Sequence, residues 1–341
     1  LEELLAGIGA AAPGVPLVGC STAGEIRSTG PGDAGVVITA LGGDGFSVAT
    51  AAAQAHEGHL REAAAHAAGC IEKAGAGAHR VLLLLTDGLA GDQREVVRGA
   101  YEVVGADVPL VGGCAGDGLK MQRTFQLHGA EVLDHAVVAA AIVSDAPIGI
   151  GVRHGWRRVG EPMIVTASAA NRVHTIDDRP ALDAYLDRLD APAEARTDPA
   201  AFTQFAMTHP LGLTRRSGEE VRFVTGADFE ERALQCVAQV PQGGQAWIME
   251  GDQGSVLAAT DDACREALAG LDGRPTLGLV AFDCIARRGV LGAEGIAAEV
   301  GRLSELAGGA PVAGFYTYGE IARTHGMTGF HNQTLVVMAV G

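Results

Sequence analysis

Two short segments carry the same polar and turn-forming residues. Residues 16–26 read PLVGCSTAGEI and residues 311–321 read PVAGFYTYGEI, so six of eleven positions are identical. An apolar run that leads into a glycine turn, a hydroxyl and an acid is typical of a strand end whose amides turn toward a ligand. The repeated pattern predicts that matching residues do the same job twice.

Candidate ligand-binding residues follow from these segments. Glu25 and Glu320 can accept hydrogen bonds from a ligand amine, while Thr22, Thr317 and glycine amides can hold a carboxylate or carbonyl. In the alternative interpretation, both acids only cap their own loops. The predicted ligand-binding residues are Gly19, Cys20, Thr22, Gly24, Glu25, Arg287, Gly314, Tyr316, Thr317, Tyr318, Gly319 and Glu320.

Two of these predictions need separate reasons. Tyr316 and Tyr318 flank Thr317 in the second segment only, where they line a ligand or belong to the core. Arg287 follows a strand-like run, and its guanidinium fork matches a carboxylate, either that of Glu320 or that of an anionic ligand. The alternative is that Arg287 is simply exposed.

A looser third copy, PLVGGCAGD, occupies residues 109–117. Cys20, Cys114 and Cys284 stand at comparable places near strand ends, which suggests nucleophiles. A thiol needs a base within reach, and no histidine partner is evident in the sequence. We therefore expect a binding protein rather than an enzyme, with buried apolar thiols, and keep a cysteine-dependent hydrolase as an alternative.

The surrounding elements predict an α/β fold. Residues 80–85, 93–104 and the segment from Pro109 form a strand, a helix and a strand, so the two strands should be parallel. Residues 276–282, 293–306 and the segment from Pro311 repeat this order. We predict two domains of mixed β-sheets with flanking helices, built from duplicated β-α-β-β units. The predicted domains are residues 1–195 and 196–341, the first trimmed at its N-terminus.

Several shorter elements have weaker signals. Residues 35–41 and 45–52 read as strands joined by a Gly-Gly-Asp-Gly hairpin turn. Residues 148–156 and 161–167 read as strands separated by a turn at 157–160.

Composition excludes some classes of function. The net charge is −16, and basic residues occur only in short pairs, so nucleic acid is not an expected partner. The longest apolar runs, 81–85 and 136–143, are far shorter than the roughly 20 residues that span a bilayer. Six scattered cysteines without a C-x-x-C pair argue against a zinc site or disulfide scaffold, and for a reducing, cytoplasmic setting.

With these residues considered together, the chain resembles the FIST family (F-box and intracellular signal transduction), found in bacteria among other organisms. The resemblance depends on VGCSTAGEI (18–26), GGCAGDG (112–118), HGW (154–156), HPLG (209–212), AFDCIARR (281–288), GFYTYGEI (314–321) and HNQTLVV (331–337). It implies an N-terminal and a C-terminal FIST domain that together sense a small molecule, such as an amino acid, and signal to a partner protein.

The resemblance also implies an alternative, because some bacterial members are haem proteins that sense nitric oxide and act on a histidine kinase. Haem requires an axial ligand. His154 and His331 stand inside the family-like motifs, and His209 is a weaker candidate. No C-x-x-C-H is present, which excludes covalent attachment.

Overall fold

The computed structural model describes residues 1–55, 58–215, 218–324 and 328–341. Within these residues, two six-stranded sheets have corresponding strand orders. The first sheet consists of β22 (Phe330–His331), β21 (Glu320–Arg323), β6 (Leu110–Cys114), β5 (His79–Thr86), β9 (Ala136–Ser144) and β4 (Phe46–Gln54). The second consists of β3 (Gly30–Gly32), β2 (Glu25–Arg27), β20 (Val312–Thr317), β19 (Gly278–Cys284), β23 (Leu335–Val340) and β10 (Ile148–Arg153).

The two sheets correspond strand by strand. β5 and β6 are parallel in the first sheet, as β19 and β20 are in the second, and the other pairs are antiparallel. Each parallel pair is joined by a helix, which is α3 (Gln93–Val104) in the first case and α7 (Ile285–Leu306) in the second. The equal strand orders are what duplicated units would produce.

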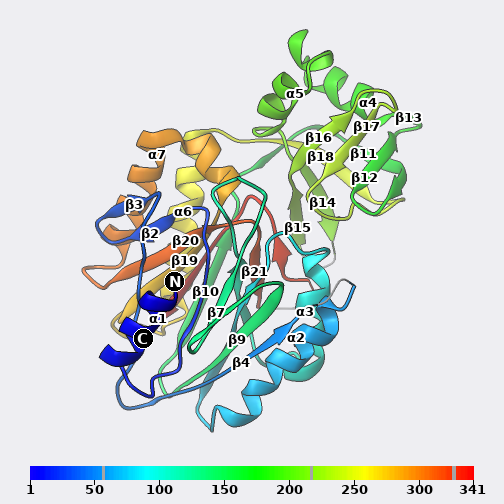
Figure 1. Ribbon diagram of the computed structural model, residues 1–341. Helices are drawn as coiled ribbons and strands as arrows, with labels where there is room; N and C mark the ends of the chain where they lie inside the picture. The colour runs from blue at the N-terminus through cyan, green and yellow to red at the C-terminus, as the bar shows by residue number, and fades with distance from the viewer. Residues whose placement is uncertain (56–57, 216–217, 325–327) are drawn as a thin grey trace.

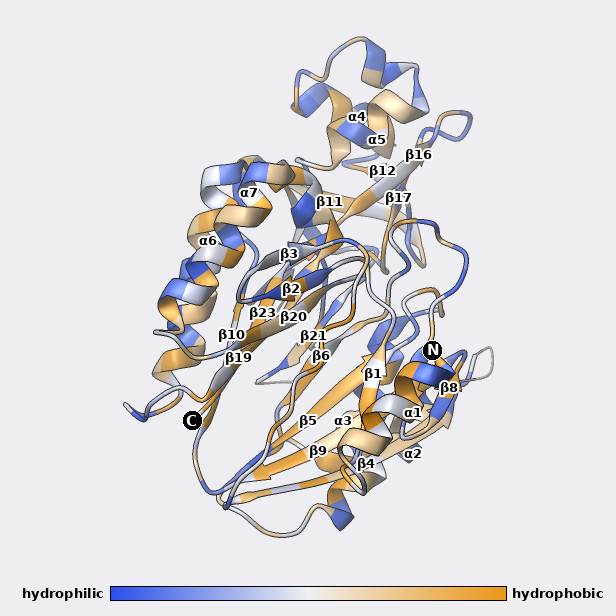
Figure 2. Cartoon of the chain, turned by 60° about the vertical axis from the view of Figure 1, so that its left-hand side comes forward, coloured by the Kyte–Doolittle hydropathy of each residue, from blue (hydrophilic) through white to orange (hydrophobic). Residues whose placement is uncertain are grey.

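Helices cover the outer faces of both sheets (Figures 1 and 2). α2 (Leu60–Ala68), followed by the 3-10 helix η1 (Gly69–Lys73), packs with α3 on the first sheet, and α6 (Gln253–Ala269) packs with α7 on the second. The inner faces meet in an apolar layer that includes Leu85, Ile142, Phe282 and Met338. Burial of this layer and of the two helix–sheet cores is the main force that holds the sheets together.

Each sheet contains strands from both ends of the chain. β2 and β3 lie beside β20 in the second sheet, whereas β21 and β22 lie beside β6 in the first. The sheets therefore do not separate at residue 195, and the predicted boundary there stays a prediction about sequence domains.

A third lobe, which consists of strands and helices, lies apart from the two sheets, at the upper right of Figure 1. Its strands are β15 (Gly218–Arg222), β14 (Leu211–Arg215), β18 (Gln245–Glu250), β11 (Arg157–Ala169), β12 (Arg172–Ile176), β17 (Ala233–Cys236) and β16 (Val224–Asp228), with β13 (Arg179–Pro180) beside β12. Its helices are α4 (Ala181–Arg188), the 3-10 helix η2 (Glu194–Arg196) and α5 (Pro199–Ala206). Tyr185 and Phe202 pack in its own core.

The N-terminal helix α1 (Glu2–Ala11) leads to a small sheet of β1 (Val18–Cys20), β7 (Gln126–His128) and β8 (Glu131–Leu133). No helix in the described part of the chain is both long enough and apolar enough to cross a membrane.

The structure confirms the predicted α/β class and both parallel strand pairs, but two local predictions were wrong. Residues 35–41 form no strand, because the chain there passes from β3 in the second sheet to β4 in the first. Residues 157–160 are not a turn but belong to β11, which pairs with β18 and bulges after Val159, where Gly160 has a φ of 65°. The helix predicted over residues 293–306 forms the part of α7 that follows a kink at Gly292, and the helical segment from Ile285 that precedes the kink was not predicted.

Candidate functional site

The three segments with the shared pattern meet at one centre. Each segment donates a main-chain hydrogen bond to the next, and the bonds form a closed ring. They are Ala23 N to Tyr316 O (2.9 Å), Tyr318 N to Cys114 O (3.2 Å) and Gly116 N to Ser21 O (3.1 Å). The donors stand at one aligned position and the acceptors at another, so the three segments use the same contact.

Glu25 lies at the start of β2 and is 8% exposed. Thr22 Oγ1 donates to Glu25 Oε1 at 3.4 Å, and Gly24 N donates to Thr22 Oγ1 at 3.3 Å. A Cβ atom on Gly32 would lie 2.7 Å from Glu25 Oε2, so the carboxylate also covers the neighbouring strand. One oxygen of Glu25 is therefore bonded within its own segment.

Glu320 repeats this arrangement in a fully buried setting. Thr317 Oγ1 donates to Glu320 Oε1 at 2.5 Å, and Gly319 N donates to Thr317 Oγ1 at 3.2 Å. Thr334 N donates to the second oxygen, Oε2, at 3.2 Å. Burial raises the pKa of Glu320 to about 8. Both of its oxygens thus have donors within the chain.

Other predicted residues have roles in packing. Gly314 allows β20 to approach β19, because a Cβ there would lie 2.1 Å from Ala281 O. Gly19 and Cys20 lie on β1, which pairs with β7. The Tyr318 hydroxyl bonds to Asp117 and accepts a hydrogen bond from Leu119 N at 2.7 Å.

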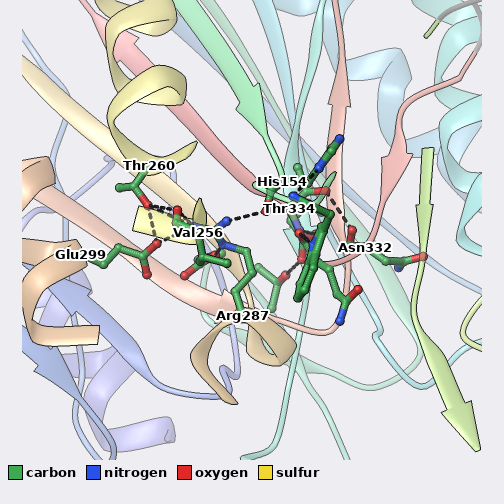
Figure 3. Close-up of polar contacts among 12 residues, drawn as sticks. His154, Val256, Thr260, Arg287, Glu299, Asn332 and Thr334 are labelled. Atoms are coloured by element: carbon green, nitrogen blue, oxygen red, sulfur yellow. Dashed lines mark hydrogen bonds and ion pairs between the residues drawn. The ribbon is translucent and has the colours of Figure 1, made fainter. Parts of the chain in front are cut away.

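Arg287 is fully buried and forms contacts different from those we predicted (Figure 3). Its Nε donates to Asp283 Oδ1 at 2.6 Å, and its Nη2 donates to Glu299 Oε1 at 2.5 Å. Nη2 also lies 3.0 Å from Thr260 Oγ1, and Nη1 lies 3.1 Å from His154 O. The expected partner Glu320 is not among these contacts, and every guanidinium nitrogen already has an acceptor.

Buried polar atoms without a hydrogen-bond partner are concentrated around this arginine and the turn before β23. In the described residues, five such atoms belong to this region. They are Asp283 Oδ2, Glu299 Oε2, Tyr316 OH, Asn332 Oδ1 and Gln333 Oε1. Most buried polar groups in proteins are paired, so such a concentration is typical of a site completed by another molecule. We call these five residues with Arg287 the buried polar cluster.

The cluster also connects the two sheets to the third lobe. Trp156 Nε1 donates to Gln333 O at 3.0 Å, and Gln333 Nε2 donates to Met207 O at 3.0 Å. Met207 packs against Gly289 of α7, where an added Cβ would lie 2.2 Å from the methionine Cε. The motifs HGW, AFDCIARR and HNQT, which are distant in sequence, therefore meet here.

Of the three thiols of the hydrolase alternative, Cys114 and Cys284 are buried and Cys20 is partly buried. Burial raises the pKa of Cys114 to about 12, and burial together with nearby Glu320 raises that of Cys284 well above its usual range. Burial raises the pKa of Cys20 likewise. Thiols held in this state are poor nucleophiles. Residues 1–55, 58–215, 218–324 and 328–341 contain no group of three or more His, Cys, Asp or Glu residues that could hold a metal ion.

The candidate haem ligands are occupied by other contacts. His154 Nδ1 accepts from Trp156 N at 3.0 Å, and its Nε2 lies 3.6 Å from Glu219 Oε1. His331 Nε2 lies 2.9 Å from Ala322 O. The weaker candidate, His209, has Nδ1 2.8 Å from Phe205 O. Both ring nitrogens of His154 lie against other groups, so His154 does not fit an axial ligand, because iron needs a ring nitrogen that carries no hydrogen and faces open space.

Sequence reasoning missed four members of the buried polar cluster, Asp283, Glu299, Asn332 and Gln333, and the neighbouring Thr260. Glu299 lies on the face of α7 that also buries Ile296 and Leu303, and Thr260 lies on the buried face of α6. A carboxylate inside an apolar helical stripe is a signal that could have been read, because an unpaired charge is rarely buried.

Comparison with known proteins identifies the family to which the chain belongs. The FIST N domain matches residues 1–179 and the FIST C domain matches residues 181–323. Uncharacterized proteins from two strains of Mycobacterium tuberculosis, CDC 1551 / Oshkosh and H37Rv, are each 26% identical over 264 residues, which cover 75% of this chain and 67% of the relative. FIST domains are associated with sensing in signal transduction. Because the two domain matches cover most of its length, the chain belongs to the FIST family.

Proposed function

We propose that this protein is a small-ligand-binding sensory protein of intracellular signal transduction, which passes its signal to a separate partner protein such as a histidine kinase. Membership of the FIST family supports the sensory role. The single observation that carries the ligand site is the gathering of unpartnered polar atoms in the buried polar cluster.

The energetics support a ligand at this position. A buried donor or acceptor without a partner costs about 1–3 kcal/mol. Asn332 and Gln333 add amide oxygens to the carboxyl and hydroxyl groups, so a small polar molecule, such as an amino acid, would find several partners at once. Binding would recover part of this cost.

The position of the cluster suggests how binding could be transmitted. Gln333 contacts Met207 of the third lobe, and Met207 packs on Gly289 of α7. A ligand that repositions Gln333 would therefore shift α7 against the third lobe. A partner protein that contacts both elements would read this shift.

We further propose that the protein binds its ligand without converting it. The cysteine-dependent hydrolase receives no support from the geometry, because the thiols at Cys114 and Cys284 have raised pKa values. Haem sensing likewise receives none from the ring nitrogens of His154.

A thermal-shift screen of amino acids, small acids and haem tests the proposal, since a ligand that binds the native state raises the melting temperature. The screen should be repeated with Gln333→Met and with Gln126→Met. Gln126 is a matched control: like Gln333 it is buried with one amide atom bonded and one unpartnered, but it lies on β7.

We expect at least one small polar compound to stabilise the wild type and the Gln126 variant, and to lose this effect in the Gln333 variant. Equal stabilisation of all three proteins would show that the ligand binds at a site that does not include Gln333. Absence of any stabilising compound would count against ligand sensing.

A further inference from the structure

Three unpartnered oxygens of the buried polar cluster lie on neighbouring elements. Asp283 lies on β19 and pairs across the parallel ladder with Tyr316 on β20, so their side chains share one face of the sheet. Glu299 reaches the same place from α7, and all three residues are at most 1% exposed. Among the described residues, Asp283 Oδ2, Glu299 Oε2 and Tyr316 OH have no hydrogen-bond partner while both acids are ionised, and a proton on one acid lets the two carboxyl groups bond to each other.

The charges at this place do not balance. Arg287 bonds to Asp283 Oδ1 and to Glu299 Oε1, so one guanidinium serves two carboxyl groups. The two carboxyl groups also lie within hydrogen-bonding reach of each other. Burial, followed by the neighbouring Glu299, raises the pKa of Asp283 well above its ordinary value. One proton on the pair leaves a single negative charge opposite Arg287.

Other charged and titratable groups around the pair come from several elements. They are Arg287 and Arg288 on α7, Cys284 at the end of β19, and Glu320 on β21. α6 contributes the Thr260 hydroxyl and the Val256 carbonyl, and the turn after β10 contributes the His154 carbonyl. Arg288 donates to Ala23 O at 3.1 Å, pairs with Asp33 and lies 4.9 Å from the Tyr316 ring centre, so it separates the ring from solvent.

We propose that Asp283 holds a proton beside Glu299 and releases it to water when a small organic cation with N–H donors binds between the two side chains and the Tyr316 hydroxyl. This inference rests on the proposed function and specifies the chemistry of the ligand. The unpartnered atoms are carboxyl oxygens and a hydroxyl, which match a primary ammonium or a guanidinium group. An anion would face two acids, whereas a cation replaces the proton and keeps the net charge of the site unchanged.

Infrared spectroscopy tests this proton without any ligand. A protonated carboxyl group has a carbonyl stretch distinct from that of a carboxylate, and we expect such a band at neutral pH in Glu320→Gln, the background for these spectra, which lacks the other buried acid with a raised pKa. Asp283→Asn and Glu299→Gln should each change or remove the band, whereas Asp33→Asn, at an exposed carboxylate, should not. A spectrum of Glu320→Gln without the band would overturn the inference, even if neither cluster variant folds.

Methylammonium and guanidinium chlorides at low concentration, with sodium chloride at equal ionic strength, test the exchange. We expect one of the two cations to abolish the band and to release one proton per bound cation, measured by calorimetry in buffers of different ionisation enthalpy. Asp283→Asn should bind this cation about tenfold or more weakly.

A band that persists in the presence of both cations would show that the pair is only structural, and would overturn the inference. The thermal-shift screen could also yield a different compound that stabilises wild type and Asp283→Asn equally. That result would overturn the inference about Asp283 but would leave the proposed function intact. The two failures can therefore be told apart.

Discussion

Asp283 and Arg287 are four residues apart, at the end of β19 and in the first turn of α7, and their Oδ1 and Nε atoms lie 2.6 Å apart with both side chains excluded from solvent. This short link fixes the start of α7 at the carboxyl end of β19, an inner strand of the second sheet. The same guanidinium reaches Glu299, more than three helical turns further along α7 and beyond the kink at Gly292.

Replacing Arg287 should therefore destabilise the protein strongly. Arg287→Met would leave two buried carboxyl groups without their cation, and we expect a loss of about 3–5 kcal/mol in the free energy of unfolding. Arg302→Met is a matched control on the same helix, because Arg302 pairs with Asp261 at 2.8 Å but is 38% exposed. Its loss should stay below about 1 kcal/mol. Similar losses for both variants, measured by chemical denaturation, would contradict a special role for Arg287.

Glu320 should make stability depend on pH. Its pKa is about 8 in the folded protein and has an ordinary value near 4.5 in the unfolded chain. Between these values the folded state keeps a proton that the unfolded state has lost, so stability falls as pH rises through this window and levels off above it. The slope for a single group is on the order of 1 kcal/mol per pH unit.

Glu320→Gln removes this titration. The free energy of unfolding of the variant, relative to wild type, should therefore increase steadily from about pH 5 to about pH 8. Thr317→Val provides a second measurement, because it deletes the hydroxyl that donates to Glu320 and helps to lower its pKa. A difference between wild type and Glu320→Gln that does not vary with pH would exclude the raised pKa.

Gly314 should tolerate no side chain. A Cβ atom there would lie 2.1 Å from Ala281 O, so Gly314→Ala must push β20 away from β19, at an expected loss of about 3 kcal/mol or more. Gly301→Ala offers the opposite case, since nothing lies within 4 Å of a Cβ at this position on α7. Removing a helical glycine should stabilise by about 0.5–1 kcal/mol. Thermal unfolding of the two variants compares them directly, and a stable Gly314 variant would refute the close approach.

Cys114 and Cys284 should resist alkylation in the native protein. Both thiols are buried with raised pKa values, so the thiolate that reacts with iodoacetamide is scarce. We expect peptide mass spectrometry to find neither residue modified under conditions that modify both in the denatured protein. Rapid labelling of native Cys284 would instead revive the hydrolase alternative.

Local patterns were enough to predict much of the fold. The apolar run at 80–85 and the amphipathic stretch at 93–104 predicted β5, α3 and the parallel pairing with β6, because all three depend on neighbours along the chain. The segment at 35–41 has the composition of a strand, but its ends are held in different sheets, which no local pattern reveals.

The candidate site was predicted less completely, for the same reason. Tyr316, Thr317 and Glu320 were singled out from the repeated segment, but as ligand-binding residues, and the bond from Thr317 to Glu320 was not predicted. Arg287 was singled out for its guanidinium fork, with Glu320, an anionic ligand or solvent as the alternatives, and it pairs instead with Asp283 and Glu299. Its true partner Glu299 enters from the far part of a helix, and Gln333 becomes part of the site only because the third lobe contacts the turn before β23.

The way in which β2–β3 and β21–β22 are exchanged between the sheets restricts how this molecule could be divided. Pieces cut at residue 195 would each carry a ribbon that completes the other piece's sheet, and each would expose an open strand edge when alone. We therefore expect such halves to be insoluble when made separately and to recover one native structure when made together. The two halves could then be encoded by two genes, but each would need the other in order to fold.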